Sequence, residues 1–291
     1  MEKTKEQLIE VYKRANKERR EKLAKKNGFK SGADYLASLQ KRKSVKVKLA
    51  KKVTKKEMLD YVVAFDTTGS MSSYIGDVKK HVEKLIPEMF SNKDLDLKMR
   101  IIAFGDYCDM SSSTSFGNAY QESEFTDNEN SLIEFVKNAQ GTSGGDGDEF
   151  YELVIKKITE ETPWRKGAKR TVLFIADAEP HPVGYSYENI IKNAQIDWEE
   201  EAKKARKQDI QFDTMSIHGT QFYKDLSKIT NGVYLKFSSS EKTASVFVAS
   251  AYSRGSAETK SKFTAYFSTA MASGDSELIG MYKSLSTKLD E

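Results

Sequence analysis

The chain is poor in the residues that build covalent or thiolate sites. Among its 291 residues, Cys108 is the single cysteine and there are three histidines. One thiol excludes an internal disulfide bond and a cysteine-based zinc site. So few histidines also argue against a histidine-rich metal centre. Protein classes that depend on paired thiols or clustered imidazoles are therefore excluded.

Long hydrophobic runs are also missing. No stretch approaches the roughly 18 uninterrupted apolar residues that a membrane-spanning helix needs. The first ten residues, MEKTKEQLIE, lack the apolar core of a secretion signal. Hydrophobic residues make up 38% of the chain and charged residues 31%, which is typical of a globular protein. We expect a cytoplasmic protein that does not contact membranes.

The net charge of +4 conceals a strong asymmetry along the chain. Residues 1–56 contain 20 lysines and arginines against 6 acidic residues, a net charge of +14. Residues 57–291 contain 27 against 37, a net charge of −10. The change of sign predicts a boundary between a basic helical extension and an acidic body.

The basic extension has signals for two helices and a strand. Asn27-Gly28 predicts the end of a first helix, and Ser31 predicts the N-cap of a second. Val45, Val47 and Leu49 alternate with lysines, which predicts an edge strand. The extension either caps the sheet as a solvated segment or binds an anionic partner, nucleic acid or an acidic protein. The sequence leaves both interpretations open.

Strands alternate with helices from residue 57 onward. This alternation predicts an α/β fold with a doubly wound, Rossmann-like, mostly parallel six-stranded sheet and helices on both faces. We expect this domain over residues 57–253, followed by a C-terminal helical tail over 254–291. A long polar helix is predicted over 187–208. The strands are expected at 61–65, 97–104, 124–125, 170–176, 210–217 and 233–237.

Polar residues cluster where the predicted strands end. Asp66-Thr67-Thr68-Gly69-Ser70 follows the first strand of the body, Asp177 follows the strand 170–176, and a glycine-rich loop spans 141–149. In an open parallel sheet, ligands bind outside the carboxyl ends of the strands. The clusters offer hard oxygen ligands, which Mg²⁺ prefers. The loop lacks Gly-Lys-Ser/Thr and is therefore no phosphate-binding P-loop.

Asp66, Thr68 and Ser70 form the pattern Asp-x-Thr-x-Ser, which resembles the metal-ion-dependent adhesion site of von Willebrand factor A domains. Ile175-Ala176-Asp177-Ala178-Glu179-Pro180-His181 resembles the Ala-Asp-Ala-Pro-Pro-His of the von Willebrand domains attached to alpha-kinases. The resemblance covers roughly residues 57–253 in the family's order. Three further segments resemble the family at 104–109, 144–149 and 229–234.

The resemblance implies a set of metal ligands. Thr68 and Ser70 would coordinate Mg²⁺ through their hydroxyls, and Asp66 and Asp177 would act mainly through bound water. Mn²⁺ or Ca²⁺ are alternatives for the cation. Thr142 would be the ligand from the second loop.

The second loop leaves its ligand open, because Ser143 and Asp146 compete with Thr142 for that role. The implied function follows from the neutral hydroxyl ligands. They leave the cation incompletely neutralised, so that an Asp or Glu carboxylate of a partner protein completes its coordination. The resemblance therefore implies an Mg²⁺-dependent protein-binding module, not an enzyme, in a larger intracellular assembly.

Two alternatives compete with this interpretation. Asp66-Thr67-Thr68-Gly69-Ser70 also resembles the Asp-x-Thr-Gly-Thr of phosphoryl-transfer enzymes of the haloacid-dehalogenase type, in which Asp66 would be the nucleophile. That chemistry needs a paired-acid loop after a later strand, whereas Asp177 is followed by Ala-Glu-Pro. The other alternative is a scaffold whose metal site is idle.

The remaining polar residues near these loops are expected to have supporting roles. Asp106 and Asp109 are interpreted as turn formers at the rim of the site. His181, after Pro180, is interpreted as a loop residue, not a metal ligand. Cys108 lacks a paired histidine in the sequence, so we expect no catalytic thiol.

Overall fold

The computed structural model divides the chain into two compact units, Met1–Lys55 and Lys56–Glu291. Each unit is described by itself. The structure describes residues 17–18, 21–38, 56–237, 243–253 and 257–287.

In the first unit, two short helical segments follow the predicted signals. Residues 21–26 are helical, and the turn that ends them contains Gly28 at a φ of +76°. The Ser31 hydroxyl accepts a hydrogen bond from the Asp34 backbone N–H at 3.1 Å and so caps the helical residues 32–38. The strand predicted around Val45 lies outside the described residues.

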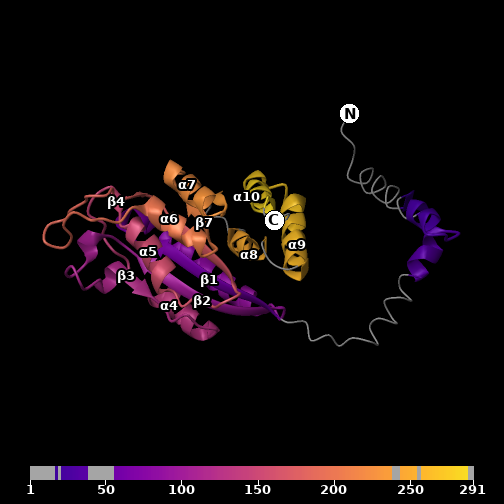
Figure 1. The fold of residues 1–291 in the computed structure, drawn as a ribbon, viewed down its shortest axis with the longest axis horizontal. Helices are drawn as coiled ribbons and strands as arrows, with labels where there is room; N and C mark the ends of the chain where they lie inside the picture. Colours follow the sequence, from indigo (N-terminus) through magenta and orange to yellow (C-terminus); the bar gives the residue numbers. More distant parts are fainter. Residues whose placement is uncertain (1–16, 19–20, 39–55, 238–242, 254–256, 288–291) are drawn as a thin grey trace. The chain divides into compact units, whose positions relative to one another are not determined.

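The second unit is built on a six-stranded sheet with the order β3-β2-β1-β5-β7-β8 (Figure 1). β3 pairs antiparallel with β2, and the other neighbours run parallel. The predicted doubly wound, mostly parallel sheet is confirmed. The strands are β1 (Glu57–Asp66), β2 (Leu95–Phe104), β3 (Tyr120–Glu122), β5 (Lys169–Ala176), β7 (Ile210–Ser216) and β8 (Tyr234–Lys236).

Helices cover both faces of this sheet. Along β1, Tyr61 and Val63 face a core shared with α3, α4, α8, α9 and α10, whereas Val62 and Ala64 face a core shared with α5, α6 and α7. This alternation is the period of two that a strand buried on both faces requires. The helices are α3 (Ile75–Phe90), α4 (Glu129–Asn138), α5 (Tyr151–Glu161), α6 (Trp198–Lys207), α7 (Gln221–Ile229), α8 (Thr243–Ser253), α9 (Ala257–Ser273) and α10 (Ser276–Ser286).

Two sequence expectations were wrong in detail. The strand expected at 124–125 lies at Tyr120–Glu122, because pairing with β2 starts at buried Tyr120. The helix expected over 187–208 is confined to α6, which Asp197 caps by accepting from the Glu199 N–H at 2.9 Å. Residues 187–197 are irregular, with Asn193 at a φ of +52°. Tyr187, Ile190, Ile191 and Ala194 do have helical spacing, but the chain turns back there and Tyr187 pairs with Ile191 in an isolated antiparallel bridge, so tertiary contacts override the local pattern.

The last two helices belong to the same core as α8. Phe263 of α9 is buried, and so are the apolar residues of α10. The α10 stripe was expected from its spacing, and all four of its members are buried: Leu278, Met281, Tyr282 and Leu285. In the described part of the chain, no helix is both long and apolar enough to cross a membrane.

The sheet order places the candidate site. Connections from β1 run to β2 on one side, while β5 lies on the other side, so the strand order reverses between β1 and β5. Asp66 ends β1, and Asp177 directly follows β5. A second, two-stranded sheet lies near this edge and joins β4 (Asp148–Glu149) to β6 (Glu179–Pro180) in parallel.

Candidate metal centre

A chain of hydrogen bonds joins four of the predicted ligands. Thr68 donates from its N–H and from its hydroxyl to Asp66 Oδ1, both at 2.7 Å. Its hydroxyl also lies 3.1 Å from the Ser70 hydroxyl, which donates to Asp177 Oδ1 at 3.0 Å. The short 3-10 helix η1 (Gly69–Ser73) after β1 turns Ser70 toward Asp177. The fold therefore brings Asp66, Thr68, Ser70 and Asp177 together.

Asp66 is held rigidly from its other side. The Tyr151 hydroxyl at the start of α5 donates to Asp66 Oδ2, and it accepts from the Ala178 N–H at 3.1 Å. Asp66 is completely buried, and this burial raises the pKa of its carboxyl to about 7, although the hydrogen bonds from Tyr151 and Thr68 oppose the rise. A buried carboxylate with such a pKa gains stability from a nearby positive charge.

Thr142 contacts Thr67, the residue between Asp66 and Thr68, and so lies beside these hydrogen bonds. Its hydroxyl lies 3.0 Å from the Thr67 hydroxyl, and its N–H donates to the Thr67 carbonyl at 2.9 Å. Among the described residues, Thr142 has no hydrogen bond to Asp66, Thr68 or Ser70. A Cβ on Gly105 would lie 2.4 Å from Thr142 Oγ1, so the glycine is what lets this loop approach β2.

The other two candidates in the second loop point elsewhere. The Ser143 carbonyl accepts from the Gly69 N–H at 3.0 Å, while the Ser143 N–H donates to Asp109 Oδ1 at 2.8 Å. Asp146 accepts from the Tyr185 hydroxyl at 3.0 Å. Asp109 therefore does more than form a turn, because it ties the loop to the end of β2.

Glu149 is a site residue that the sequence analysis missed. Its side chain is buried, and Oε1 lies 2.8 Å from the position that a Cβ on Gly144 would take, beside Thr68. Burial, together with the negative charges of Asp66 and Asp106, raises the pKa of Glu149 to about 10. Glu149 is the only glutamate in the glycine-rich loop, and this was a signal in the sequence. The sequence cannot show, however, which way the side chain points.

These residues fit a divalent cation. Within the described residues, three buried carboxylate oxygens have no hydrogen-bond partner, and two of them, Asp177 Oδ2 and Glu149 Oε2, belong to residues near this edge of the sheet. Buried polar atoms are normally paired, so unpaired oxygens at one edge need a partner. The donors are carboxylates and hydroxyls, which are ligands for Mg²⁺, Mn²⁺ or Ca²⁺ and not for soft metals.

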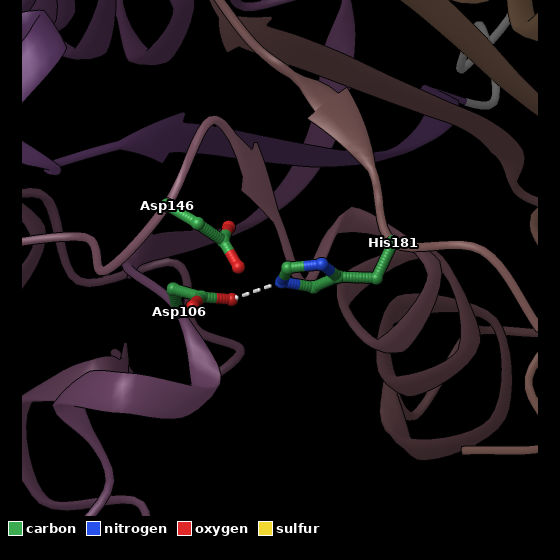
Figure 2. Close-up of side chains that lie close together, drawn as sticks. All are labelled: Asp106, Asp146 and His181. Atoms are coloured by element: carbon green, nitrogen blue, oxygen red, sulfur yellow. Dashed lines mark hydrogen bonds and ion pairs between the residues drawn. The ribbon is translucent and has the colours of Figure 1, made fainter. Parts of the chain in front are cut away.

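A second polar cluster lies on the same side of the domain. His181 Nε2 lies 2.7 Å from Asp106 Oδ1, and ligand atoms of Asp106, Asp146 and His181 all lie within 4.8 Å of one another (Figure 2). Burial alone would lower the pKa of His181, but the hydrogen bond and charge of Asp106 outweigh it and the pKa is raised. Asp106 does form the predicted turn, since it caps η2 (Tyr107–Asp109).

Comparisons with known proteins agree on the family. The model of the von Willebrand factor type A domain matches residues 60–254, which is more than half of the chain. The alpha-protein kinase vwkA of Dictyostelium discoideum is 28% identical over 138 residues, which is 46% of this chain and 21% of that protein. The chain thus spans about a fifth of the length of this curated relative.

Two solved structures are similar in part. The conserved hypothetical protein BatB from Bacteroides thetaiotaomicron is 16% identical, with 66% of this chain and 96% of that chain covered and a TM-score of 0.44. The pilus adhesin SpaC from Lactobacillus rhamnosus GG, in an open conformation, is 12% identical, and the match covers 66% of this chain and 29% of that chain with a TM-score of 0.47. On the match of the family model, the chain belongs to the von Willebrand factor type A domain family, whose members are generally interaction modules and not enzymes.

Proposed function

We propose that this protein binds a partner protein through Mg²⁺ held by Asp66, Thr68, Ser70, Thr142 and Asp177. The observation that carries the proposal is the direction of the hydrogen bonds. Thr68 and Ser70 both donate their hydroxyl protons to buried carboxylates, at 2.7 and 3.0 Å. Each hydroxyl directs its proton toward a carboxylate. The lone pairs of the hydroxyl oxygen are therefore available to a cation.

Each residue has a separate part in this proposal. Asp66 accepts from Thr68 and Tyr151, so it orients the hydroxyl ligands and supplies negative charge. Ser70 is exposed and lies on the side open to a partner, whereas Asp177 is buried and offers its unpaired oxygen to the cation. The bound cation would supply a positive centre that a carboxylate of the partner completes. Mn²⁺ and Ca²⁺ are alternative cations, and Thr142 is proposed through its loop position.

The geometry does not favour the phosphoryl-transfer alternative. A nucleophilic Asp66 would have to present a carboxylate oxygen to the phosphorus atom. Asp66 is completely buried, and both of its oxygens already accept hydrogen bonds. The kinase in the name of vwkA describes that protein, of which this chain spans 21%. An idle metal site remains the alternative that an experiment must exclude.

The setting of the protein is part of the proposal. We place it in the cytoplasm, as a subunit of a larger intracellular assembly, since its single cysteine needs no oxidising compartment. The excess of 14 positive charges in residues 1–56 makes this segment a candidate contact for an anionic partner.

A peptide screen tests this function. Immobilised full-length protein is exposed to a display library of peptides that contain Asp or Glu, in Mg²⁺ and in EDTA. Selected peptides should bind in Mg²⁺, be released by EDTA, and lose binding when their acidic residue becomes Asn or Gln. Ser70→Ala should lose the same peptides, because it removes an exposed hydroxyl ligand.

Asp127→Asn is the matched control. Asp127 is exposed and has no part in the site, so this variant should select the same peptides as the wild type. Peptides that bind equally in EDTA, or equally to Ser70→Ala, would contradict a role of the cation in partner binding and leave the site idle.

A further inference from the structure

Three segments that the adhesion-type site does not use converge on one point. Asp106 follows β2, Asp146 lies in the glycine-rich loop, and His181 follows β6. Figure 2 shows both carboxyl groups directed toward the nitrogen-bearing edge of the His181 ring. Each residue offers one ligand atom, and these atoms lie within 4.8 Å of one another. The cluster therefore combines two carboxylates with one imidazole, from three separate loops.

The fold holds these three side chains in place with dedicated contacts. The pairing of β4 with β6 fixes the spacing between the glycine-rich loop and His181, whose N–H donates to the Glu149 carbonyl at 3.2 Å. Tyr185 stacks on the His181 ring with centroids 3.6 Å apart, and its hydroxyl donates to Asp146 Oδ2 at 3.0 Å. A metal-binding histidine and its neighbouring carboxylate are commonly oriented in this way by further partners.

The cluster carries more negative charge than one imidazole balances. Asp106 and His181 are buried, at 0% and 2% exposed, and Asp146 is exposed. Among the residues that the structure describes, the ion pair of His181 with Asp106 is the one ion pair that Asp106 or Asp146 forms. A cation that joins the two carboxylates would balance the remaining negative charge.

We propose that Asp106, Asp146 and His181 form a second cation site, separate from the adhesion-type site, for a divalent metal ion such as Zn²⁺. The imidazole ligand sets the class of metal, because imidazole suits zinc, copper, iron and nickel, whereas carboxylate and water ligands suit Mg²⁺. Solvent reaches the site from the side of Asp146, the exposed ligand.

The distances need only small adjustments for such an ion. Zinc lies about 2.0–2.2 Å from nitrogen and oxygen ligands, so ligand atoms around one ion are at most about 4.2 Å apart. The ligand atoms of the three residues now lie within 4.8 Å of one another. A shift of the exposed Asp146 side chain would bring them to the shorter separation. The 2.7 Å contact of His181 with Asp106 opens slightly as the metal replaces the shared proton.

A metal at this point would join the glycine-rich loop to the segments after β2 and β6. The same glycine-rich loop carries Thr142 and Glu149, which border the first site. A second cation would therefore stiffen the loop that forms one side of the partner-binding face. This inference does not depend on the proposed function, since it concerns different side chains.

Isothermal titration of Zn²⁺ into full-length, EDTA-treated protein tests the proposal. The titration is made in an excess of Mg²⁺, so that the oxygen-only site is occupied by magnesium. One Zn²⁺ should bind per chain, and Asp146→Asn and His181→Gln should each weaken it more than about tenfold. Tyr185→Phe keeps the ring that stacks on His181 but removes the hydroxyl that donates to Asp146. This variant should weaken Zn²⁺ binding less than Asp146→Asn or His181→Gln.

A spectroscopic readout locates the metal. The chain has three histidines, so their imidazole nitrogens are readily separated by nitrogen-15 NMR. Zn²⁺ should shift the Nε2 resonance of His181 and leave that of buried His81 in place. Asp66→Ala should abolish Mg²⁺-dependent stabilisation and retain the zinc signal, which separates the two sites.

Asp127→Asn serves as the control here too, with unchanged zinc affinity expected. Asp146→Asn and His181→Gln must retain Mg²⁺-dependent stabilisation, which shows that they fold. Zinc binding that persists at full strength in both variants would overturn the proposal, as would the absence of a zinc-dependent shift at His181.

Discussion

The two ends of strand β1 carry two buried carboxylates with opposite surroundings. Asp60, near the start of the strand, is completely buried and accepts from the Arg165 backbone N–H and from Arg165 Nε, both at 2.6 Å. Asp66, at the end of the strand, is equally buried but accepts from neutral donors, Thr68 and Tyr151. Among the described residues, no cationic side chain forms an ion pair with Asp66.

The difference separates a carboxylate that the chain's own arginine compensates from one that has no cationic partner among the described residues. The guanidinium of Arg165 also binds Asp96 Oδ1 at 2.7 Å, so one end of the sheet compensates its own carboxylates. At the other end, Asp177 and Glu149 each keep an unpaired oxygen. Because buried charges are tolerated when they are paired or bind metals, the uncompensated end is where a cation is expected.

The largest effect is expected at the compensated end. Arg165→Met leaves Asp60 buried without its cation, and should lower the free energy of unfolding by about 3–5 kcal/mol. Urea denaturation in EDTA and in Mg²⁺ should give the same loss, since Arg165 takes no part in the metal site. Arg206→Met, at an exposed arginine of α6, is the control and should have little effect. A loss that Mg²⁺ restores would contradict the division between the two ends.

A pH-dependent effect is expected at the uncompensated end. The folded pKa of Glu149 is about 10 against an ordinary 4.5, so without metal the folded protein holds a proton that the unfolded chain releases between these values. The stability is therefore greatest below the unfolded pKa and falls as pH rises, by at most about 1.4 kcal/mol per pH unit for one such proton. Glu149→Gln cannot lose this proton, so it should flatten the fall.

Urea unfolding of both proteins in EDTA between pH 5 and 9, a range that lies between the two pKa values, makes the comparison. The two curves should converge toward pH 5, with the variant more stable at higher pH. Curves that run parallel through the whole range would show that Glu149 does not hold the extra proton.

The smallest effect is expected from the basic extension. Deleting residues 1–40 should leave the Mg²⁺-dependent stabilisation within about 0.5 kcal/mol of wild type, as for changes remote from a site. The same deletion should abolish binding to labelled polyglutamate, DNA or RNA, and this binding should weaken steeply with salt because exposed charges are screened. Fluorescence anisotropy over a salt series measures it. Binding that survives the deletion would place the anion contact elsewhere.

Much of this fold was predictable, because it is encoded locally. The buried run around Val63 and the polar residues after it mark a strand end, and parallel strands bring such ends to one edge. The proximity of Asp66, Thr68, Ser70 and Asp177 was predicted in this way. The irregular conformation of residues 187–197 was not predicted, because the apolar residues from Tyr187 to Ala194 have helical spacing, whereas the chain turns back at the Tyr187–Ile191 bridge.

The remaining site residues were hidden for a different reason. Tyr151 begins α5 and Glu149 ends β4, and the spacing along the sequence does not predict the contact of Tyr151 with Asp66 or the position of Glu149 beside Thr68. His181 was interpreted as a loop residue because it follows Pro180, and its partner Asp106 is 75 positions away in the sequence. Contacts of such separation depend on the packing of β4 against β6, a two-residue pairing too short for a sequence pattern to reveal.

The Mg²⁺ dependence of stability tests the central claim most directly, that the uncompensated carboxylates hold a cation. Urea unfolding of EDTA-treated protein is measured at rising Mg²⁺ for wild type, Ser70→Ala and Asp66→Ala. The wild type should gain about 1.4 kcal/mol for each tenfold rise in Mg²⁺ above the Kd, and about 2.7 kcal/mol at one hundred times the Kd. Ser70→Ala should gain less and Asp66→Ala should not respond. Equal gains in wild type and Asp66→Ala, or no gain in wild type, would contradict the account.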